Sequence, residues 1–133
     1  MQSSARESLQ FLVDEGISKD TVDVLGTANK KGQTPIFIAC RYGRLDVAQF
    51  LFNVGAVEDV RTPDKFGLTP MHAACSNAHL SVAQWLLEVG GPNEVRIPDK
   101  YGWTPMHTTC GNGHLEVAQW LFDHGAAGDV RST

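Results

Sequence analysis

Cysteine and histidine occur in this chain at spacings that could support metal binding or nucleophilic chemistry. Cys75 precedes His79 by four positions, and Cys110 precedes His114 by four. On one continuous helix, residues four apart lie on the same face, so each pair could act together. A structural zinc site needs four converging ligands, and the sequence has no C-x-x-C pair to contribute to one. The helix is also expected to end inside each pair, because Ala78 and Gly113 occupy its terminating position. We therefore expect no metal site and no cofactor.

The cysteines themselves indicate a structural role. Cys40, Cys75 and Cys110 recur every 35 residues, on the helix side that the repeat assigns to the core. A reactive cysteine instead needs an exposed thiolate beside a positioned base. Cysteines on helices packed about 8–10 Å apart also exceed the ~7 Å Cα limit for a disulfide. No phosphate-binding glycine loop or paired-carboxylate signature occurs, so we predict no catalytic residue and no enzyme activity.

The 35-residue spacing extends to a whole seven-residue pattern. Thr-Pro-Met-His-Ala-Ala-Cys at 69–75 recurs as Thr-Pro-Met-His-Thr-Thr-Cys at 104–110 and, more loosely, as Thr-Pro-Ile-Phe-Ile-Ala-Cys at 34–40. A fixed period of this size indicates a repeat protein, in which stacked units bury a continuous core. We place the whole chain, 1–133, in one domain without an evident C-terminal cap. Its parts are an N-terminal half-repeat at 1–28 and three units at 29–63, 64–98 and 99–133.

Each unit begins with signals for a short helix. The threonine that opens each pattern is a suitable N-cap, and the following proline suits the first helical position, where its missing N–H is not needed. Gly43 and Gly113 fall where a helix ends in a left-handed residue. Ala78 occupies the same position in the second unit, so we expect a left-handed backbone there as well.

A second helix and a linking segment complete each unit. The helix is predicted to begin near Leu45, Leu80 and Leu115 and to stop at Gly55, Gly90 and Gly125. Its broad apolar surface requires a neighbour on each side. The linking segment reads as extended chain entering a tight turn, through its proline and its Asp-x-x-Gly. We expect the charged residues of these segments to be mostly solvated, namely Glu58, Asp59, Arg61, Asp64, Glu94, Arg96 and Asp99.

Together these motifs resemble the ankyrin repeat, whose pattern has a D-x-x-G turn, T-P-L-H-x-A-A on the first helix, G-H before the second and L-L-x-x-G-A at its end. The second and third units fit best. The usual period is about 33, and Phe37 replaces the motif histidine in the first unit. The resemblance implies an all-α ankyrin-repeat solenoid of helix-turn-helix units with projecting β-turn or hairpin segments. It also implies that His72 and His107 hydrogen-bond within and between turns.

The resemblance further implies a scaffold that binds a protein or peptide partner on its concave face, where turn tips and the solvent side of the first helices form a groove. At matching positions it selects as partner-binding residues Lys30, Lys31, Gln33, Arg41, Tyr42, Lys65, Phe66, Leu68, Ser76, Asn77, Lys100, Tyr101, Trp103 and Asn112. The aromatic residues in this set are of the kind that dominate interfaces. With the lysines, they favour an acidic and aromatic or apolar peptide. Alternatively, the rings simply pack on adjacent turns.

Composition limits the other partners. Lysine and arginine give 11 positive charges against 15 acidic ones, a formal net charge of −4, without a dense basic run. That balance disfavours nucleic acid, because nonspecific affinity for it comes from neutralising phosphates. No apolar run approaches the roughly 20 residues that cross a bilayer, and the polar start lacks a signal peptide's apolar core. We expect no membrane partner, and a cytoplasmic or nuclear protein with reduced cysteines.

Two other functions remain open at this stage. The chain could recruit substrates for a larger enzyme or ligase-type assembly. It could also be an architectural array that self-associates, through an end where no polar capping repeat follows Trp120, Leu121 and Phe122.

Overall fold

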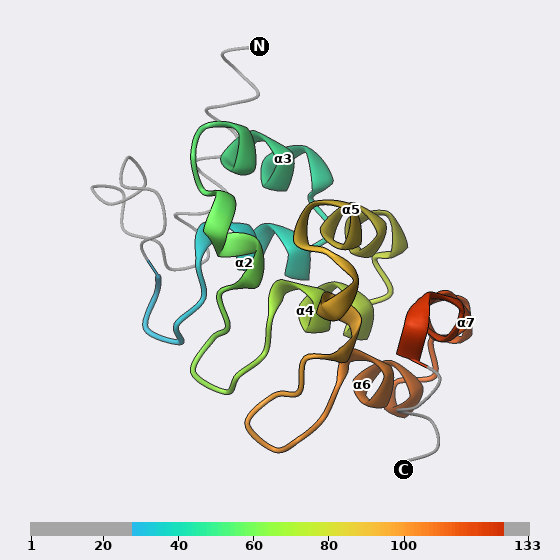
Figure 1. Ribbon diagram of the computed structural model, residues 1–133. Helices are drawn as coiled ribbons and strands as arrows, with labels where there is room; N and C mark the ends of the chain where they lie inside the picture. Colours follow the sequence, from blue (N-terminus) through green and yellow to red (C-terminus); the bar gives the residue numbers. More distant parts are fainter. Residues whose placement is uncertain (1–27, 127–133) are drawn as a thin grey trace.

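The protein is a stack of helix pairs. The computed structural model describes residues 28–126, and within them every regular element is helical (Figure 1), which confirms the all-α prediction. The half-repeat predicted at 1–28 lies outside the described residues except for Ala28, as does 127–133, the end of the third unit. The elements are α2 (Pro35–Arg41), α3 (Leu45–Asn53), η1 (Val57–Arg61), α4 (Pro70–Ser76), α5 (Leu80–Gly90), η2 (Pro92–Arg96), α6 (Pro105–Gly111), α7 (Leu115–Leu121) and η3 (Phe122–Ala126).

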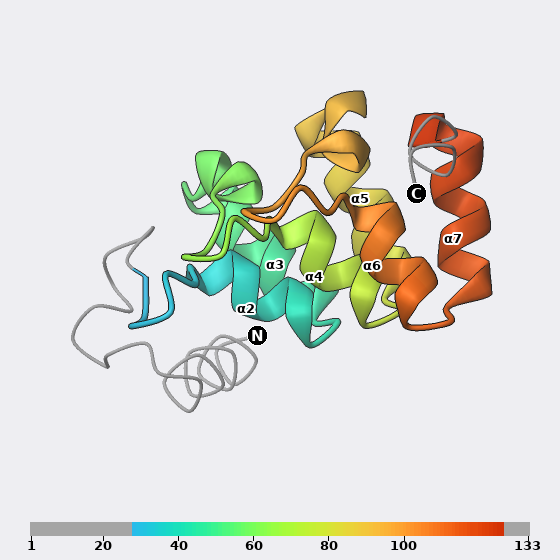
Figure 2. The ribbon, with the colours of Figure 1, turned by 90° about the horizontal axis from the view of Figure 1, so that it is seen from below.

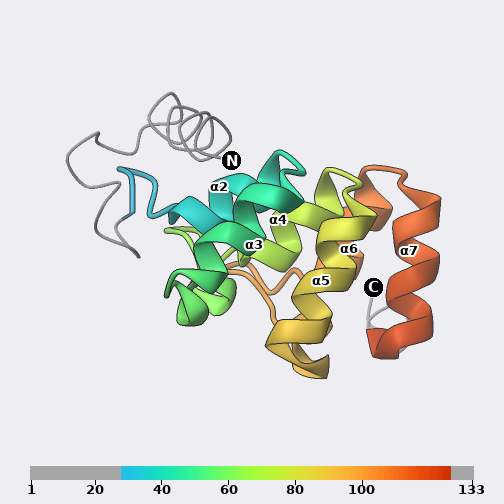
Figure 3. The same ribbon diagram turned by 90° about the horizontal axis from the view of Figure 1, so that it is seen from above.

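The helices form two layers with the turns on one side. The first helices of the units, α2, α4 and α6, pack side by side, and each also packs against the second helix of its own unit (Figures 2 and 3). The turns that precede the first helices project together in the same direction (Figure 1). Within 28–126, no helix is both long and apolar enough to span a bilayer.

The predicted caps start the first helices. Thr34 Oγ1 accepts a hydrogen bond from Phe37 N at 3.1 Å, and Thr69 Oγ1 accepts one from His72 N at 3.3 Å. Each helix has proline at its first position. Because a cap satisfies N–H groups that have no partner inside the helix, helices of only seven residues begin at defined points.

The left-handed residue predicted after each first helix is present in all three units. Gly43 has φ 73° and Gly113 has φ 75°, and Ala78 follows them with φ 61°. The prediction for Ala78 is confirmed. It is the one non-glycine residue with positive φ among residues 28–126.

The linking segments were predicted wrongly in one respect. They are not extended throughout, because 57–61 and 92–96 each form a short 3₁₀ helix. This helix turns Val60 and Val95 into the core, where their exposed fractions are 3% and 0%. The burial of these two side chains is the physical reason for the helical turn. The helix stop predicted at Gly90 also moves by one residue, because Gly90 is the last helical residue and Gly91 carries the positive φ of 93°.

The core runs through all three units but is thinner at the last one. Cys40 and Cys75 are fully buried, as predicted, whereas Cys110 is exposed. The prediction for Cys110 was wrong because no described helix packs on that side of α6. In the same unit Leu115 is 83% exposed and Phe122 48% exposed, although Leu121 is completely buried.

Candidate functional site

Each turn is fixed by one side chain at its start. Asp64 Oδ1 accepts hydrogen bonds from Phe66 N at 2.9 Å and Leu68 N at 3.0 Å. Asp99 accepts the equivalent bonds from two amides of the third turn, and Asn29 does so in the first turn. Because the carboxylate or amide holds the turn from inside, the side chains at the turn tips point outward.

The turns are hydrogen-bonded to each other. Lys65 N donates to Lys31 O at 3.1 Å, and Lys100 N donates to Phe66 O at 2.8 Å. The approach is close, since a Cβ on Gly67 would lie only 2.6 Å from Lys100 N. The three turns therefore form one continuous edge with a fixed spacing between equivalent side chains.

His72 ties the second unit to the third. Its Nδ1 accepts a hydrogen bond from Thr69 N at 3.1 Å, and its Nε2 lies 2.9 Å from Trp103 O in the next turn. Since Nδ1 accepts, Nε2 carries the proton and donates it to the carbonyl. Burial lowers the pKa of His72, and the bond to Trp103 O opposes this. The bonds that the resemblance implied within and between turns are thus confirmed for His72, whereas His107 bonds to Thr104 of its own unit.

A groove lies between the first and second units, on the side of the turns. Its volume is about 490 Å³. Half of the predicted contact residues line it, and its walls come from two turns and from helices α2 and α4. The lining residues are Lys31, Gln33, Phe37, Arg41, Asp64, Phe66, Leu68, Ala73, Ser76 and Asn77.

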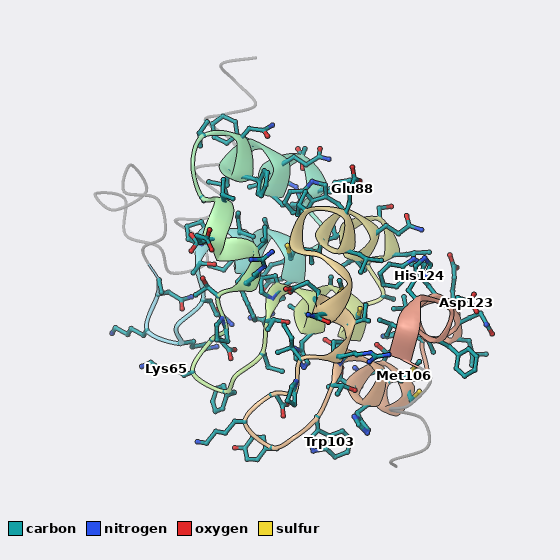
Figure 4. All side chains as sticks on the ribbon, in the orientation of Figure 1. Lys65, Glu88, Trp103, Met106, Asp123 and His124 are labelled. Carbon is teal, nitrogen blue, oxygen red and sulfur yellow. The ribbon has the colours of Figure 1, made fainter. Side chains whose placement is uncertain are left out.

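The remaining predicted residues flank the groove or lie on the third unit: Lys30, Tyr42, Lys65, Lys100, Tyr101, Trp103 and Asn112. Lys65 extends from its turn away from the helices, whereas Trp103 lies beside the start of α6 (Figure 4). Tyr101 is 67% exposed and Trp103 50%. The Trp103 ring contacts His107 of its own unit edge-on, with centroids 5.5 Å apart, rather than lying on an adjacent turn. Asn112 donates to Ser76 O at 3.0 Å and so joins two units.

Gln33 is less available than predicted. Its exposed fraction is only 7%, and its Oε1 accepts a hydrogen bond from Asn29 Nδ2 at 3.0 Å. The Gln33 side chain therefore supports the first turn more than it offers a contact.

Sequence reasoning missed three groove residues, namely Phe37, Asp64 and Ala73. Phe37 had a signal, because it stands where the other units have the motif histidine. Asp64 and Ala73 follow the repeat pattern, so nothing in the sequence distinguishes them as lining residues.

The charged linking segments were expected to be mostly solvated, and this is wrong for Glu94 and Asp64. The Glu94 side chain is 3% exposed and its Oε1 lies 3.6 Å from Arg61 Nε. Burial raises the pKa of Glu94, and the Arg61 charge opposes the rise. Arg61 also donates to Gly90 O at 3.0 Å, and Arg96 repeats this bond to Gly125 O at 2.9 Å. These arginines join neighbouring units because the carbonyls at a helix end lack partners inside the helix.

The cysteine and histidine pairs are not assembled for chemistry. Burial raises the pKa of Cys75 to about 12, so its thiol stays protonated and a poor nucleophile. His79 packs over Gly43 of the preceding unit, and His114 Nε2 lies 2.9 Å from Ser76 O. Across residues 28–126, no group of three or more His, Cys, Asp or Glu side chains could hold a metal ion.

Comparison with protein-family models decides the family. The model described as ankyrin repeats (3 copies) matches residues 54–132, and the model described as ankyrin repeat matches residues 31–59. The chain belongs to the ankyrin repeat family. Ankyrin repeats are generally protein–protein interaction modules, and ankyrin repeat proteins are typically non-enzymatic scaffolds. A search of curated proteins gave no match to this ankyrin chain.

Proposed function

We propose that this ankyrin domain binds a segment of a partner protein on its concave face, with the groove between the first two units as the principal seat. The observation that carries the proposal is the groove of about 490 Å³, which falls on the predicted contact face. Binding sites of this kind are concave, with apolar walls and a few placed polar groups.

The residues that line the groove have the composition of such a binding site. The groove's apolar lining residues include Phe66, Leu68 and Ala73. Lys31 and Arg41 bring positive charge to it, whereas Asp64 is engaged by two backbone N–H groups. Exposed Tyr42 and Phe66 lie at 43% and 47% exposure. Large aromatic side chains at this exposure supply contact area at low entropic cost.

The test selects peptides against the folded domain by phage display and then compares two variants. Ser76→Arg places a long side chain in the groove, whereas Gln49→Arg makes a similar change at an exposed position of α3. Selected peptides should lose binding to the first variant and keep binding to the second, with equal melting temperatures. Peptides that bind both variants equally would refute the groove as the seat.

A second candidate, self-association through the C-terminal end, has its own observation. Leu115 and Phe122 of the third unit are 83% and 48% exposed. Exposed apolar side chains of this size favour contact with another chain. Sedimentation should then show mass rising with protein concentration, and Leu115→Glu with Phe122→Glu should abolish the rise. A monomer at high concentration would remove this candidate.

A further inference from the structure

The concave face changes in character from the first unit to the third. Lys31 of the first turn corresponds to Phe66 and Tyr101 in the next two turns. Arg41 at the end of α2 has uncharged counterparts at the ends of α4 and α6. Only the turn-tip lysine, Lys30 in the first unit, is repeated throughout. Positive charge is therefore concentrated at one end of the face and aromatic surface at the other.

The first unit is the cationic end. Lys30 and Lys31 are exposed and Arg41 is partly exposed. The Arg41 guanidinium lies 5.2 Å from the Tyr42 ring centroid, which orients it without neutralising it. Asp64 is the sole carboxylate lining this groove, and its Oδ1 already accepts two backbone N–H groups.

The third unit is the aromatic end. Tyr101 and Trp103 are on the same turn and are 67% and 50% exposed. The edge-on contact with His107 of α6 at 5.5 Å holds the Trp103 ring in place beside that helix (Figure 4). Two oriented rings on a fixed turn form a platform for an aromatic or aliphatic side chain.

The hydrogen bonds between the turns set the distance between these two ends. Neighbouring units stack at about the helix-packing distance of 8–10 Å, so two junctions separate the ends by roughly 16–20 Å. An extended peptide advances about 3.3 Å per residue. It therefore covers that distance with about five or six residues.

We propose that the partner segment is an extended, two-part peptide, with acidic side chains over Lys30, Lys31 and Arg41 and aromatic or apolar side chains over Tyr101 and Trp103. The two parts are separated by about five or six residues. This inference rests on the proposed function, namely that the concave face is the binding face. Neither part needs high affinity alone, because linking two weak contacts at the matching distance raises the total affinity.

The probes are labelled synthetic peptides measured by fluorescence anisotropy. The spaced peptide carries three acidic residues, a Gly-Ser spacer of about five residues and then Trp-Leu-Trp. A second peptide lacks the spacer. A third, the serine peptide, has serine in place of the three acidic residues. The spaced peptide should bind at least about tenfold tighter than either of these. Lys31→Glu with Arg41→Glu should weaken it about tenfold, and leave the serine peptide unchanged. The matched control is Lys65→Glu with Lys100→Glu, which changes the charge equally and should weaken binding less.

The position of the peptide on the domain is measured independently with a photo-crosslinker attached to the acidic end of the peptide. The crosslinker should modify residues of the first unit. Crosslinks to the third unit, or equal effects of the two charge reversals, would overturn the two-part arrangement. If phage-selected peptides need the groove but the spaced peptide does not bind, the inference fails while the proposed function stands. If neither the phage-selected peptides nor the spaced peptide binds through the concave face, the inference and the proposed function both fail. Tighter binding of an oligo(dT) strand than of the peptide, weakened by Lys31→Glu with Arg41→Glu, would identify a nucleic-acid site and overturn the proposal.

Discussion

Alanine substitution at Gly43 and at Gly113 makes one chemical change in two different surroundings. The two glycines have nearly the same backbone conformation, with φ of 73° and 75°. A Cβ on Gly113 would meet nothing within 4 Å, whereas a Cβ on Gly43 would lie 2.6 Å from His79 Nδ1. The difference between the two variants therefore isolates the packing of His79 on the preceding unit.

The magnitude follows from three contributions. A left-handed alanine costs about 1–2 kcal/mol, and alanine recovers about 0.4–1 kcal/mol by restricting the unfolded chain. Gly113→Ala should therefore lower the free energy of unfolding by about 1 kcal/mol. Gly43→Ala adds the cost of overpacking against the imidazole, about 1–3 kcal/mol. Because His79 is only half-buried and can rotate, we expect the lower part of that range.

Urea unfolding followed by circular dichroism gives the free energy of unfolding of both variants and of the wild type. The comparison requires that the free energy falls with urea concentration at the same slope in all three proteins. Repeating the pair in a His79→Ala background should bring the two costs together, because the clashing ring is gone. If Gly43→Ala costs no more than Gly113→Ala in the wild-type background, His79 does not pack on Gly43 and this account of the unit junction is wrong.

Three further changes test other parts of the fold. Ala78→Gly should raise the free energy of unfolding by up to about 1 kcal/mol, since glycine has no Cβ penalty at φ 61°. Thermal melting measures the change. The control is Ala118→Gly inside α7, which should lower the free energy of unfolding by about 1 kcal/mol. Burial raises the pKa of Glu94 above its ordinary 4.5, so wild-type stability falls as pH rises through the raised pKa. Urea titrations across that pH range should show the free energy of unfolding of Glu94→Gln rising relative to that of the wild type as pH increases. If the difference between the two free energies does not change with pH, the pKa of Glu94 is not raised. Burial lowers the pKa of His72 below 6.5, so the wild type loses stability as pH falls from 6.5 through the lowered pKa. His72→Phe should lose that acid sensitivity in the same measurement, and an unchanged pH profile would show that His72 is not held neutral.

The repeated motifs were sufficient to predict the family and the helix layout. Thr-Pro caps, left-handed positions and the D-x-x-G turns act within a few residues of themselves, so the sequence alone reveals them. Even the unusual backbone of Ala78 followed from its place in the repeat. Local signals of this kind give the fold because each unit is one supersecondary structure repeated.

What the sequence did not reveal depends on contacts between units. Arg61 reaches Gly90, 29 positions away, and its Nε lies 3.6 Å from Oε1 of the buried Glu94. The sequence predicts Gln33 as a contact residue, whereas in the structure its side chain is buried and hydrogen-bonded to Asn29 of the same turn. Phe37 lines the groove together with Phe66 and Leu68 of the next unit. Each of these features requires knowing how two units fit together, which no single unit encodes.

The bond between His72 and Trp103 O, which joins the second unit to the third, has a kinetic consequence. The third unit is held from one side among the described residues, and its Cys110 and Leu115 are exposed. In an array where each unit is stabilised by its neighbours, loss of this bond weakens the contact between the second and third units and favours their separation. A partner segment spanning the face would cross this junction. Opening of this junction would release the contacts at Tyr101 and Trp103, so the opening rate of the junction would limit how long those contacts last.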